Sequence, residues 1–232
     1  MEHRYYAQLL LLNNIRFQRK VIIESATEIE IHGICDASEK AYGACVYLRT
    51  INPDRFVWTQ FLTAKSKVAP IKSQAIPRFE LSGTLLLTSL ISGIQQALLN
   101  NLTRTVCWTD STIVLHWINT SPHTLKTFVA NRVSEIKTKT SIRDWRHVLT
   151  NNSADLISRG QMPEEFLRPT IWQHDPEWLQ QSDECWPTWT LKPQIEIRKR
   201  AICLSATPAD YSLLQRYSSW PKLIRITARC LR

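Results

Sequence analysis

The stretch that decides the fold is residues 31–43, Ile31-His32-Gly33-Ile34-Cys35-Asp36-Ala37-Ser38-Glu39-Lys40-Ala41-Tyr42-Gly43. An apolar run carries Asp36 to its end, a polar turn follows, and a second apolar run, residues 44–48, heads back. This pattern is typical of a β-hairpin with an acid at the end of its first strand. Because burying a single carboxylate there would be costly, we expect Asp36 to have partners, either basic groups or further carboxylates around a cation.

The residues around this hairpin predict a third strand and an antiparallel start to the sheet. Apolar and polar residues alternate over residues 28–35, which indicates a half-buried strand. Asn52-Pro53-Asp54 indicates a turn, and residues 56–63 are rich in aromatic and β-branched residues. Two tight connections between three strands favour antiparallel pairing. A polar, basic loop is expected over residues 65–76.

The second half of the pattern alternates helices with short strands. Pro77 suits the first turn of a helix, which we expect over about residues 78–99 with Glu80 in its first turn. Residues 103–109 predict a strand that ends at Asp110, and Ser111 and Thr112 can cap the helix that follows. Further elements are expected as a helix over 127–137, a strand over 145–148 and a short helix over 154–160 with Asp155 in its first turn.

The predicted order is therefore β-β-β-α-β-α-α-β-α. A long crossover helix between the third and fourth strands implies that the fourth strand lies parallel to a neighbour. We expect an α/β fold with a mixed five-stranded sheet, three antiparallel strands and then parallel ones, flanked by helices.

The domain organisation follows from shifts in composition. We predict a lead-in over residues 1–27, the α/β domain over 28–160, a Trp- and Pro-rich extension and linker over 161–207, and an amphipathic helix over 208–232 that leads into a missing domain. The extension holds Trp172, Trp178, Trp186 and Trp189, which could pack onto the domain.

Composition excludes several classes of protein. The chain of 232 residues has 29 Lys+Arg against 20 Asp+Glu, a formal charge of +9, which favours a polyanionic partner, although a merely basic protein would look the same. Its six cysteines form no C-x-x-C pair and accompany no H-x(3–5)-H pattern, so a zinc finger and a disulfide framework are not indicated. With no secretory signal and no run of about 20 apolar residues, we expect a soluble protein.

Four acids occupy comparable positions in the predicted elements. Asp36 and Asp110 end strands, and Glu80 and Asp155 begin helices that could close over the same edge. Four converging carboxylates would repel one another unless divalent cations lay among them. Oxygen ligands select Mg²⁺ or Mn²⁺ over zinc, and a pair of such ions can promote hydrolysis of a phosphodiester.

The order D…E…D…D on this scaffold resembles ribonuclease H. The local sequence is closer still to the ribonuclease H domain of BEL/Pao-type LTR retrotransposon Pol polyproteins, a resemblance that covers roughly residues 29–160. It rests on five segments: HGICDASEKAYGACVYLR, LTAKSKVAPIKSQAIPRFEL, VCWTDSTIVLHWI, FVANRVSEI and NNSADLISRG. Residues 1–27 resemble the tail of a reverse transcriptase. The region after Gly160 resembles the connector that precedes an integrase zinc-binding domain.

The resemblance implies a metal-dependent endonuclease that hydrolyses the RNA strand of RNA–DNA hybrids during reverse transcription. It carries over four residues as catalytic and metal-binding, with two Mg²⁺ or Mn²⁺ ions: Asp36, Glu80, Asp110 and Asp155. Asp36 would bridge both ions, Glu80 and Asp110 would hold the first, and Asp155 the second. Selectivity should come from backbone geometry and 2′-hydroxyl contacts. Candidate nucleic-acid contacts are Ser38, Ser73, Gln74, Ser111 and Asn131.

The implied partners are an RNA–DNA hybrid and the reverse transcriptase and integrase domains of the same polyprotein, with no membrane. The implied location is cytoplasmic, in a retrotransposon particle, or nuclear. Many ribonucleases H carry a mobile His in the loop before the last Asp. Here His147 lies inside a predicted strand, so a structural role is favoured for it.

Three other interpretations remain open. Asp110-Ser111-Thr112 resembles the D-[ST]-G of retroviral aspartic proteases, but the glycine is missing and a helix follows. A second possibility is a catalytically inactive nucleic-acid-binding remnant with the same fold. In the third, the four acids are only turn, cap and dipole residues, although their joint order argues against it.

Overall fold

The computed structural model describes residues 6–16, 18, 20–71, 74–98, 102–149, 152–167 and 175–188. Contacts divide the chain into two compact units, residues 1–192 and 193–232. The second unit lies outside the described residues, and so do most of the predicted linker, the predicted helix over 208–232 and the candidate contact Ser73.

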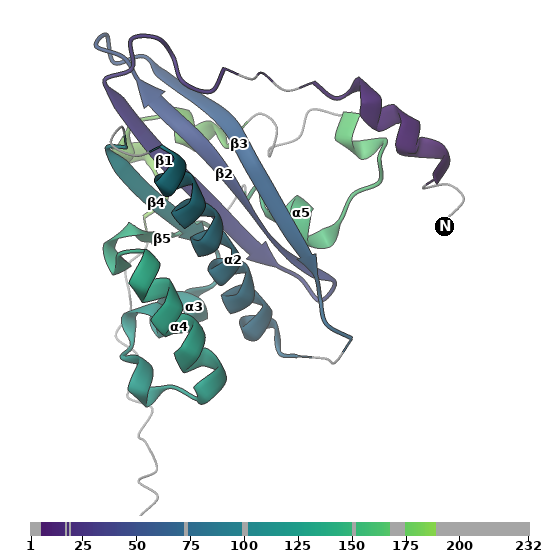
Figure 1. Ribbon diagram of the computed structural model, residues 1–232, viewed down its shortest axis with the longest axis vertical. Coiled ribbons are helices and arrows are strands. Elements are labelled where there is room, and N and C mark those ends of the chain that lie inside the picture. The colour runs from purple at the N-terminus through teal and green to yellow at the C-terminus, as the bar shows by residue number, and fades with distance from the viewer. Residues whose placement is uncertain are drawn as a thin grey trace, which may run out of the picture. The chain divides into compact units, whose positions relative to one another are not determined.

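The first unit is built on a five-stranded sheet with the order β3-β2-β1-β4-β5. Its strands are β1 (Glu28–Ala37), β2 (Ala41–Ile51), β3 (Val57–Val68), β4 (Arg104–Thr109) and β5 (Trp145–His147). β1 pairs antiparallel with β2, and β2 with β3, whereas β4 runs parallel to both β1 and β5. The predicted ribonuclease H-like mixed sheet is confirmed (Figure 1).

Four α-helices complete the predicted element order. They are α2 (Ile76–Ala97), α3 (Thr112–Asn119), α4 (Thr127–Lys139) and α5 (Asp155–Arg159). Short 3-10 helices occur at η1 (Leu9–Asn14), η2 (Pro122–Thr124), η3 (Ile142–Asp144), η4 (Glu165–Leu167), η5 (Glu177–Gln180) and η6 (Asp183–Cys185). Ser111 caps α3, as predicted, because its side chain accepts a hydrogen bond from the Val114 backbone N–H.

Two predicted boundaries were wrong. β3 continues to Val68, paired with Ala41 of β2, where a loop from residue 65 was expected. Its last residues are exposed, and lysines are common on an exposed edge strand because they oppose pairing with another chain. α2 begins at Ile76, so Glu80 is its fifth residue and does not lie in the first turn.

The sheet has a hydrophobic core on each face. On one face α2, α3 and α4 pack against residues of alternate positions in β1 and β4, including Ile31 and Cys107. The front of Figure 1 shows α2 and α4 across this face. On the other face, Ile34 and Trp108 pack with Trp178, Leu179 and Trp186.

The second core contains part of the segment that was predicted as an extension. Trp178 and Trp186 are buried, and their rings lie 4.6 Å and 5.8 Å from that of Trp108. Buried Arg49 of β2 anchors the segment to the sheet. Its guanidinium donates hydrogen bonds to the carbonyl oxygens of Leu179 at 2.9 Å and Gln181 at 3.0 Å. Residues 175–188 therefore cover one face of the sheet. Trp172 and Trp189 lie outside the described residues.

The start of the described chain is helical over residues 6–14. It lies beside η4, and Gln8 donates a hydrogen bond of 2.7 Å to Glu164 (Figure 1). Among the described residues, no helix has both the length and the apolar character needed to span a bilayer.

Candidate active site

Asp36 and Asp110 lie side by side at one end of the sheet. β1 and β4 are parallel, and Cys35 is paired with Thr109. Asp36 directly follows Cys35, and Asp110 directly follows Thr109. Asp36 is 7% exposed, whereas Asp110 is exposed. The two carboxyl groups are close enough to hydrogen-bond to each other. The parallel register thus brings together the two strand-end acids expected from the sequence.

Glu80 reaches the same end of the sheet from α2. The helix can approach the strand because residue 83 is glycine: a Cβ there would lie 3.0 Å from the carbonyl oxygen of Asp36. Ser111 orients the half-buried glutamate, since its Oγ donates a hydrogen bond of 2.6 Å to Glu80 Oε2. Ser111 therefore both caps α3 and holds Glu80.

Asp155 arrives on α5, which packs over β2 where the strand has no side chain. A Cβ at Gly43 would lie only 2.6 Å from Ile157 Cγ2, so the glycine permits this close approach. One turn along the helix, buried Ser158 donates a hydrogen bond to Asp36 Oδ2. Asp155 itself is paired with Arg159, with 2.6 Å between Oδ1 and Nε.

Burial and mutual repulsion raise the pKa of three of these carboxyl groups. The pKa of Asp36 rises to about 7, mainly because of burial and further because of the charges of Asp110 and Asp155, against the hydrogen bond from Ser158. Partial loss of solvent also raises the pKa of half-buried Glu80 and, although part of its side chain is exposed at the surface, that of Asp110, with added repulsion between neighbouring acids. No ion pair with a described Lys or Arg offsets the charge of Asp36, Glu80 or Asp110.

The chemistry of this donor set fits a divalent cation. It offers only carboxylate oxygens, which Mg²⁺ and Mn²⁺ prefer, and a cation would relieve the repulsion that raises these pKa values. Their positions do not yet form a ligand cage: among the described residues, no three His, Cys, Asp or Glu side chains are grouped so as to hold a metal ion. One oxygen of Asp155, Oδ1, is engaged by Arg159.

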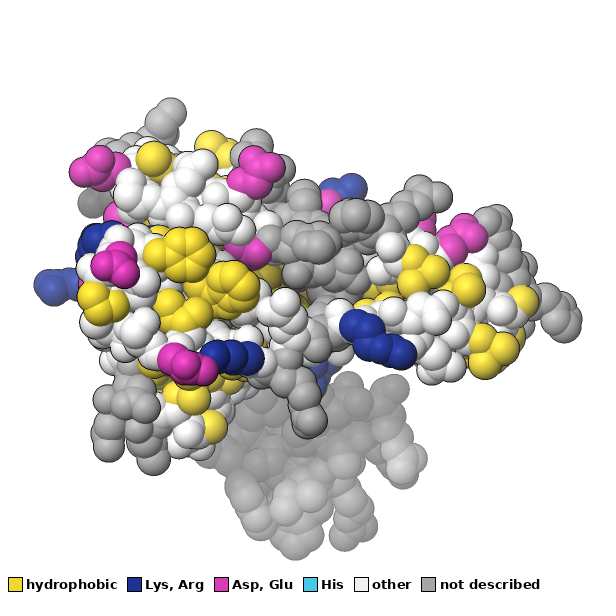
Figure 2. Space-filling model, turned by 90° about the horizontal axis from the view of Figure 1, so that it is seen from above, with side chains coloured by type: hydrophobic (Ala, Val, Ile, Leu, Met, Phe, Trp, Pro, Cys, Tyr) yellow, Lys and Arg dark blue, Asp and Glu magenta, His cyan; other side chains and the backbone are white. Residues whose placement is uncertain are grey.

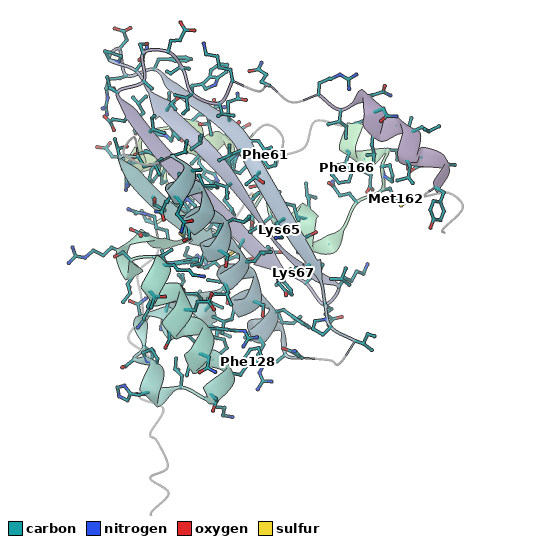
Figure 3. All side chains as sticks on the ribbon, viewed as in Figure 1. Phe61, Lys65, Lys67, Phe128, Met162 and Phe166 are labelled. Carbon is teal, nitrogen blue, oxygen red and sulfur yellow. The ribbon has the colours of Figure 1, made fainter. Side chains whose placement is uncertain are left out.

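Basic side chains surround the same end of the sheet. Lys65 and Lys67 extend from the end of β3 (Figure 3), Lys40 lies in the β1–β2 turn, and Arg78 lies in the first turn of α2. No acid of the described chain forms an ion pair with these four side chains. They are therefore available to a polyanion that approaches the carboxylates.

The remaining predicted contacts are scattered. Ser38 donates a hydrogen bond of 2.7 Å to the Ser158 carbonyl and so helps to hold α5. Gln74 precedes α2 and is half-buried, and Asn131 is exposed on α4. Their contacts with nucleic acid stay predictions.

His147 is buried, and its Nε2 lies 2.9 Å from the carbonyl oxygen of Asp110, within hydrogen-bond distance. It contacts the backbone of the segment that carries a candidate catalytic acid.

Sequence reasoning missed two residues that act on the acids, Ser158 and Asn152. Ser158 donates to Asp36, and the Asn152 side chain hydrogen-bonds to Asp110 and lowers its pKa against the effect of burial. The available signal for Ser158 was its position three residues after Asp155, which places both on neighbouring positions of a helix. Nothing local singles out Asn152.

Several solved ribonuclease H structures are similar to this chain. The N-terminal RNase H domain of a Mycobacterium tuberculosis protein is 12% identical with a TM-score of 0.36, covering 61% of this chain and 99% of that one. LC11-RNase H1, solved with an RNA/DNA hybrid, is 11% identical with a TM-score of 0.36, covering 60% and 99%. The protease–reverse transcriptase of prototype foamy virus is 10% identical with a TM-score of 0.34, covering 65% and 21%.

No curated protein matches the chain. A family model does, over residues 2–111, and it is described as the Pao retrotransposon-like RNaseH-like domain. The matched region contains β1 to β4 and α2, with Asp36, Glu80 and Asp110. The resemblance seen in the sequence is thereby confirmed: residues 2–111 match the family model of the Pao retrotransposon-like RNaseH-like domain.

Proposed function

We propose that this protein is a metal-dependent endonuclease that hydrolyses the RNA strand of RNA–DNA hybrids. The observation that carries the proposal is the meeting of Asp36 and Asp110, with Glu80 and Asp155 on adjoining helices, at one end of a ribonuclease H-like sheet. Asp36, Glu80 and Asp110 form no ion pair with a described Lys or Arg. Such a cluster of acids is costly to retain, and a catalytic role explains why it is present.

The acids and the residues around them have different roles in this proposal. Asp36, Glu80, Asp110 and Asp155 would hold two Mg²⁺ ions, which when bound supply an activated water and stabilise the leaving oxygen. Ser158 and Ser111 keep Asp36 and Glu80 in place through their hydrogen bonds. Lys40, Lys65, Lys67 and Arg78 would bind the phosphate backbone, since they surround the acids and have no described ion pair.

The family supports a place in a retrotransposon polyprotein. The reverse transcriptase and integrase domains of such a polyprotein are the proposed neighbours, and reverse transcription is the process that supplies RNA–DNA hybrids. A second candidate function is a nucleic-acid-binding domain without catalysis. The pairing of Asp155 with Arg159, and the absence of a three-ligand group among the described residues, favour this alternative.

Cleavage of a hybrid labelled separately on each strand tests the proposal. We expect cleavage of the RNA strand in Mg²⁺ and none in EDTA, with single-stranded RNA and duplex DNA left intact. Hybrid binding without cleavage would instead support the non-catalytic alternative. Cleavage that persists in EDTA, or that cuts the DNA strand equally, would contradict the proposed function.

A further inference from the structure

A cavity lies at the other end of the sheet from the carboxylates. β5 pairs only with residues 107–109 of β4, so the first half of β4 has no strand beside it on this side. The space left there is a cavity of about 380 Å³, bordered by the end of α2, by η3 and by residues 102–106. Its border at Arg104 is six residues along β4 from Asp110, which at the rise of a strand is roughly 20 Å, whereas its β5 residue Arg146 pairs with Trp108, two residues before Asp110. None of the four candidate catalytic acids lines the cavity.

Three arginines line this cavity: Arg104, Arg143 and Arg146. Arg104 is paired with Asp183 and lies 3.7 Å from Glu30. Arg143 and Arg146 form no ion pair with any acid of the described chain. The buried Nε of Arg146 also has no hydrogen-bond partner among the described residues. An unsatisfied buried donor is uncommon in a folded protein, and the rest of the Arg146 side chain is only half-buried.

Two features prepare these guanidinium groups for a ligand. Arg104 and Arg146 lie over the Trp186 ring, with their Cζ atoms 4.9 Å and 5.9 Å from its centroid. These cation–π contacts restrict the motion of both side chains. The acid that lines the cavity, Asp144, is engaged by its own turn, because its Oδ2 accepts a hydrogen bond of 2.9 Å from the Ser141 backbone N–H.

We propose that this cavity is a second anion site, which binds a phosphate group between Arg143 and Arg146. Both arginines line the cavity, and a planar guanidinium group matches the geometry of phosphate oxygens and binds them through charged hydrogen bonds. The volume is within the range of small-ligand pockets, so a phosphate can enter with its attached sugar. Figure 2 shows the molecule from above the view of Figure 1, where acidic side chains and fewer basic ones lie around a hydrophobic patch. A general positive surface does not mark the site; the unpaired arginines do.

The test uses the full chain without divalent metal, so that the carboxylates and any catalysis do not contribute. The probes are inorganic phosphate, followed by calorimetry, and a labelled single-stranded RNA of 12 nucleotides, followed by fluorescence anisotropy. The variants are Arg143→Gln, Arg146→Gln and their combination. Arg55→Gln is the matched control, since exposed Arg55 lies on the β2–β3 turn and pairs with Glu28.

We expect the double variant to bind phosphate at least about ten-fold more weakly, and Asp144→Asn to bind it more tightly, with Arg55→Gln unchanged. If a nucleic-acid phosphate occupies the site, the dependence of RNA affinity on salt should also fall, by about 0.7 in slope for each lost contact. Weaker phosphate binding with unchanged RNA binding would identify free phosphate or a nucleotide as the source. Unchanged phosphate binding in the double variant would overturn the proposal. Should that variant fail to fold, exposed Arg143→Gln alone decides the question in the same way.

Discussion

Ser158 is the residue through which α5 holds Asp36. Replacing it with alanine removes the hydrogen bond to Asp36 Oδ2 without changing any charge. Because such supporting hydrogen bonds orient metal-binding carboxylates, we expect the cleavage rate and the Mg²⁺ affinity to fall about 10- to 100-fold, with a loss of stability of about 1–3 kcal/mol. Single-turnover cleavage against Mg²⁺ concentration measures both. Ser89→Ala, at an exposed serine that bonds to a carbonyl of its own helix, is the control and should leave both values unchanged. Equal rates for Ser158→Ala and the control would exclude this role.

Glu30 gives the fold an acid-sensitive ion pair. Its burial favours the neutral form, but hydrogen bonds and charges from His32 and Arg49 outweigh this and lower the pKa of Glu30 to about 2. A lowered folded-state pKa means that the stabilisation is complete above the ordinary value of about 4.5 and is lost as the pH falls towards 2. The wild-type melting temperature should therefore fall steeply below about pH 4.5.

The variant Glu30→Gln tests that assignment. It leaves buried Arg49 without its charged partner, which typically costs about 3–5 kcal/mol at neutral pH, and its stability should depend less on pH below 4.5. Glu28→Gln is the matched control because that acid makes an exposed pair with Arg55, worth about 0–1 kcal/mol. Thermal melts from pH 2 to 7 make the comparison. A Glu30→Gln protein with wild-type stability and wild-type acid sensitivity would contradict the account.

At the scale of elements, the contact between β2 and α5 depends on Gly43. A methyl group there would lie 2.6 Å from Ile157 Cγ2, so Gly43→Ala should push α5 away and cost about 1–3 kcal/mol. Activity should fall as well, because α5 carries Asp155 and Ser158. Adding Ile157→Ala to Gly43→Ala should restore part of the loss, and denaturant melts of the single and double variants measure the coupling.

Gly93→Ala supplies the contrast in a helix. A Cβ at residue 93 meets nothing within 4 Å, so this variant should gain about 0.5–1 kcal/mol of stability.

For the contact between β2 and α5, additive effects of Gly43→Ala and Ile157→Ala would show that α5 does not pack on β2 in this way.

The order of the elements was predictable because each has a local signature. The alternation before Asp36, the turn at residues 52–54 and Pro77 suffice for the first three strands and for the presence of α2. The end of β3 was not predictable, since Lys65 and Lys67 look like loop residues until their pairing with β2 is known. The first turn of α2 was misplaced for a similar reason, because nothing local marks Ile76 as its start.

The candidate acids could be predicted from the sequence, but the residues that contact them could not. Strand ends indicate Asp36 and Asp110, and a helix start indicates Asp155, whereas Glu80 was expected in the first turn of its helix and is the fifth residue of α2. The parallel pairing of β1 and β4 follows from the crossover. The hydrogen bond from Ser158, the pairing of Asp155 with Arg159 and the contact of Asn152 with Asp110 depend on how α5 and its preceding loop lie on the sheet. No pattern in the sequence reports that placement.

At the scale of the whole molecule, residues 175–188 should be part of the folded domain. They bury Trp178 and Trp186 against Trp108 and bind Arg49, so a domain that ended at residue 160, as predicted from the sequence, would expose one face of the sheet. We expect a chain ending at Gly160 to aggregate or unfold.

A point substitution tests the same segment in the full chain. Trp186→Ala should lose about 3–5 kcal/mol, whereas Phe56→Ala, at a 55% exposed aromatic residue, should be nearly neutral. Circular dichroism melts measure the stability of the chain ending at Gly160, of Trp186→Ala and of Phe56→Ala. A fully stable chain ending at Gly160 would contradict the role of this segment.

The central claim is that the carboxylates at the end of the sheet perform hybrid cleavage. The most direct test compares wild type and Asp110→Asn in single-turnover cleavage of an RNA-labelled RNA–DNA hybrid in Mg²⁺, with hybrid binding measured separately in EDTA. We predict metal-dependent cleavage by the wild type and a loss of at least about a hundred-fold in the variant, with binding unchanged. Wild-type cleavage by Asp110→Asn would place the active site elsewhere, and a wild type that binds the hybrid without cutting it would contradict the assignment of this protein as an enzyme.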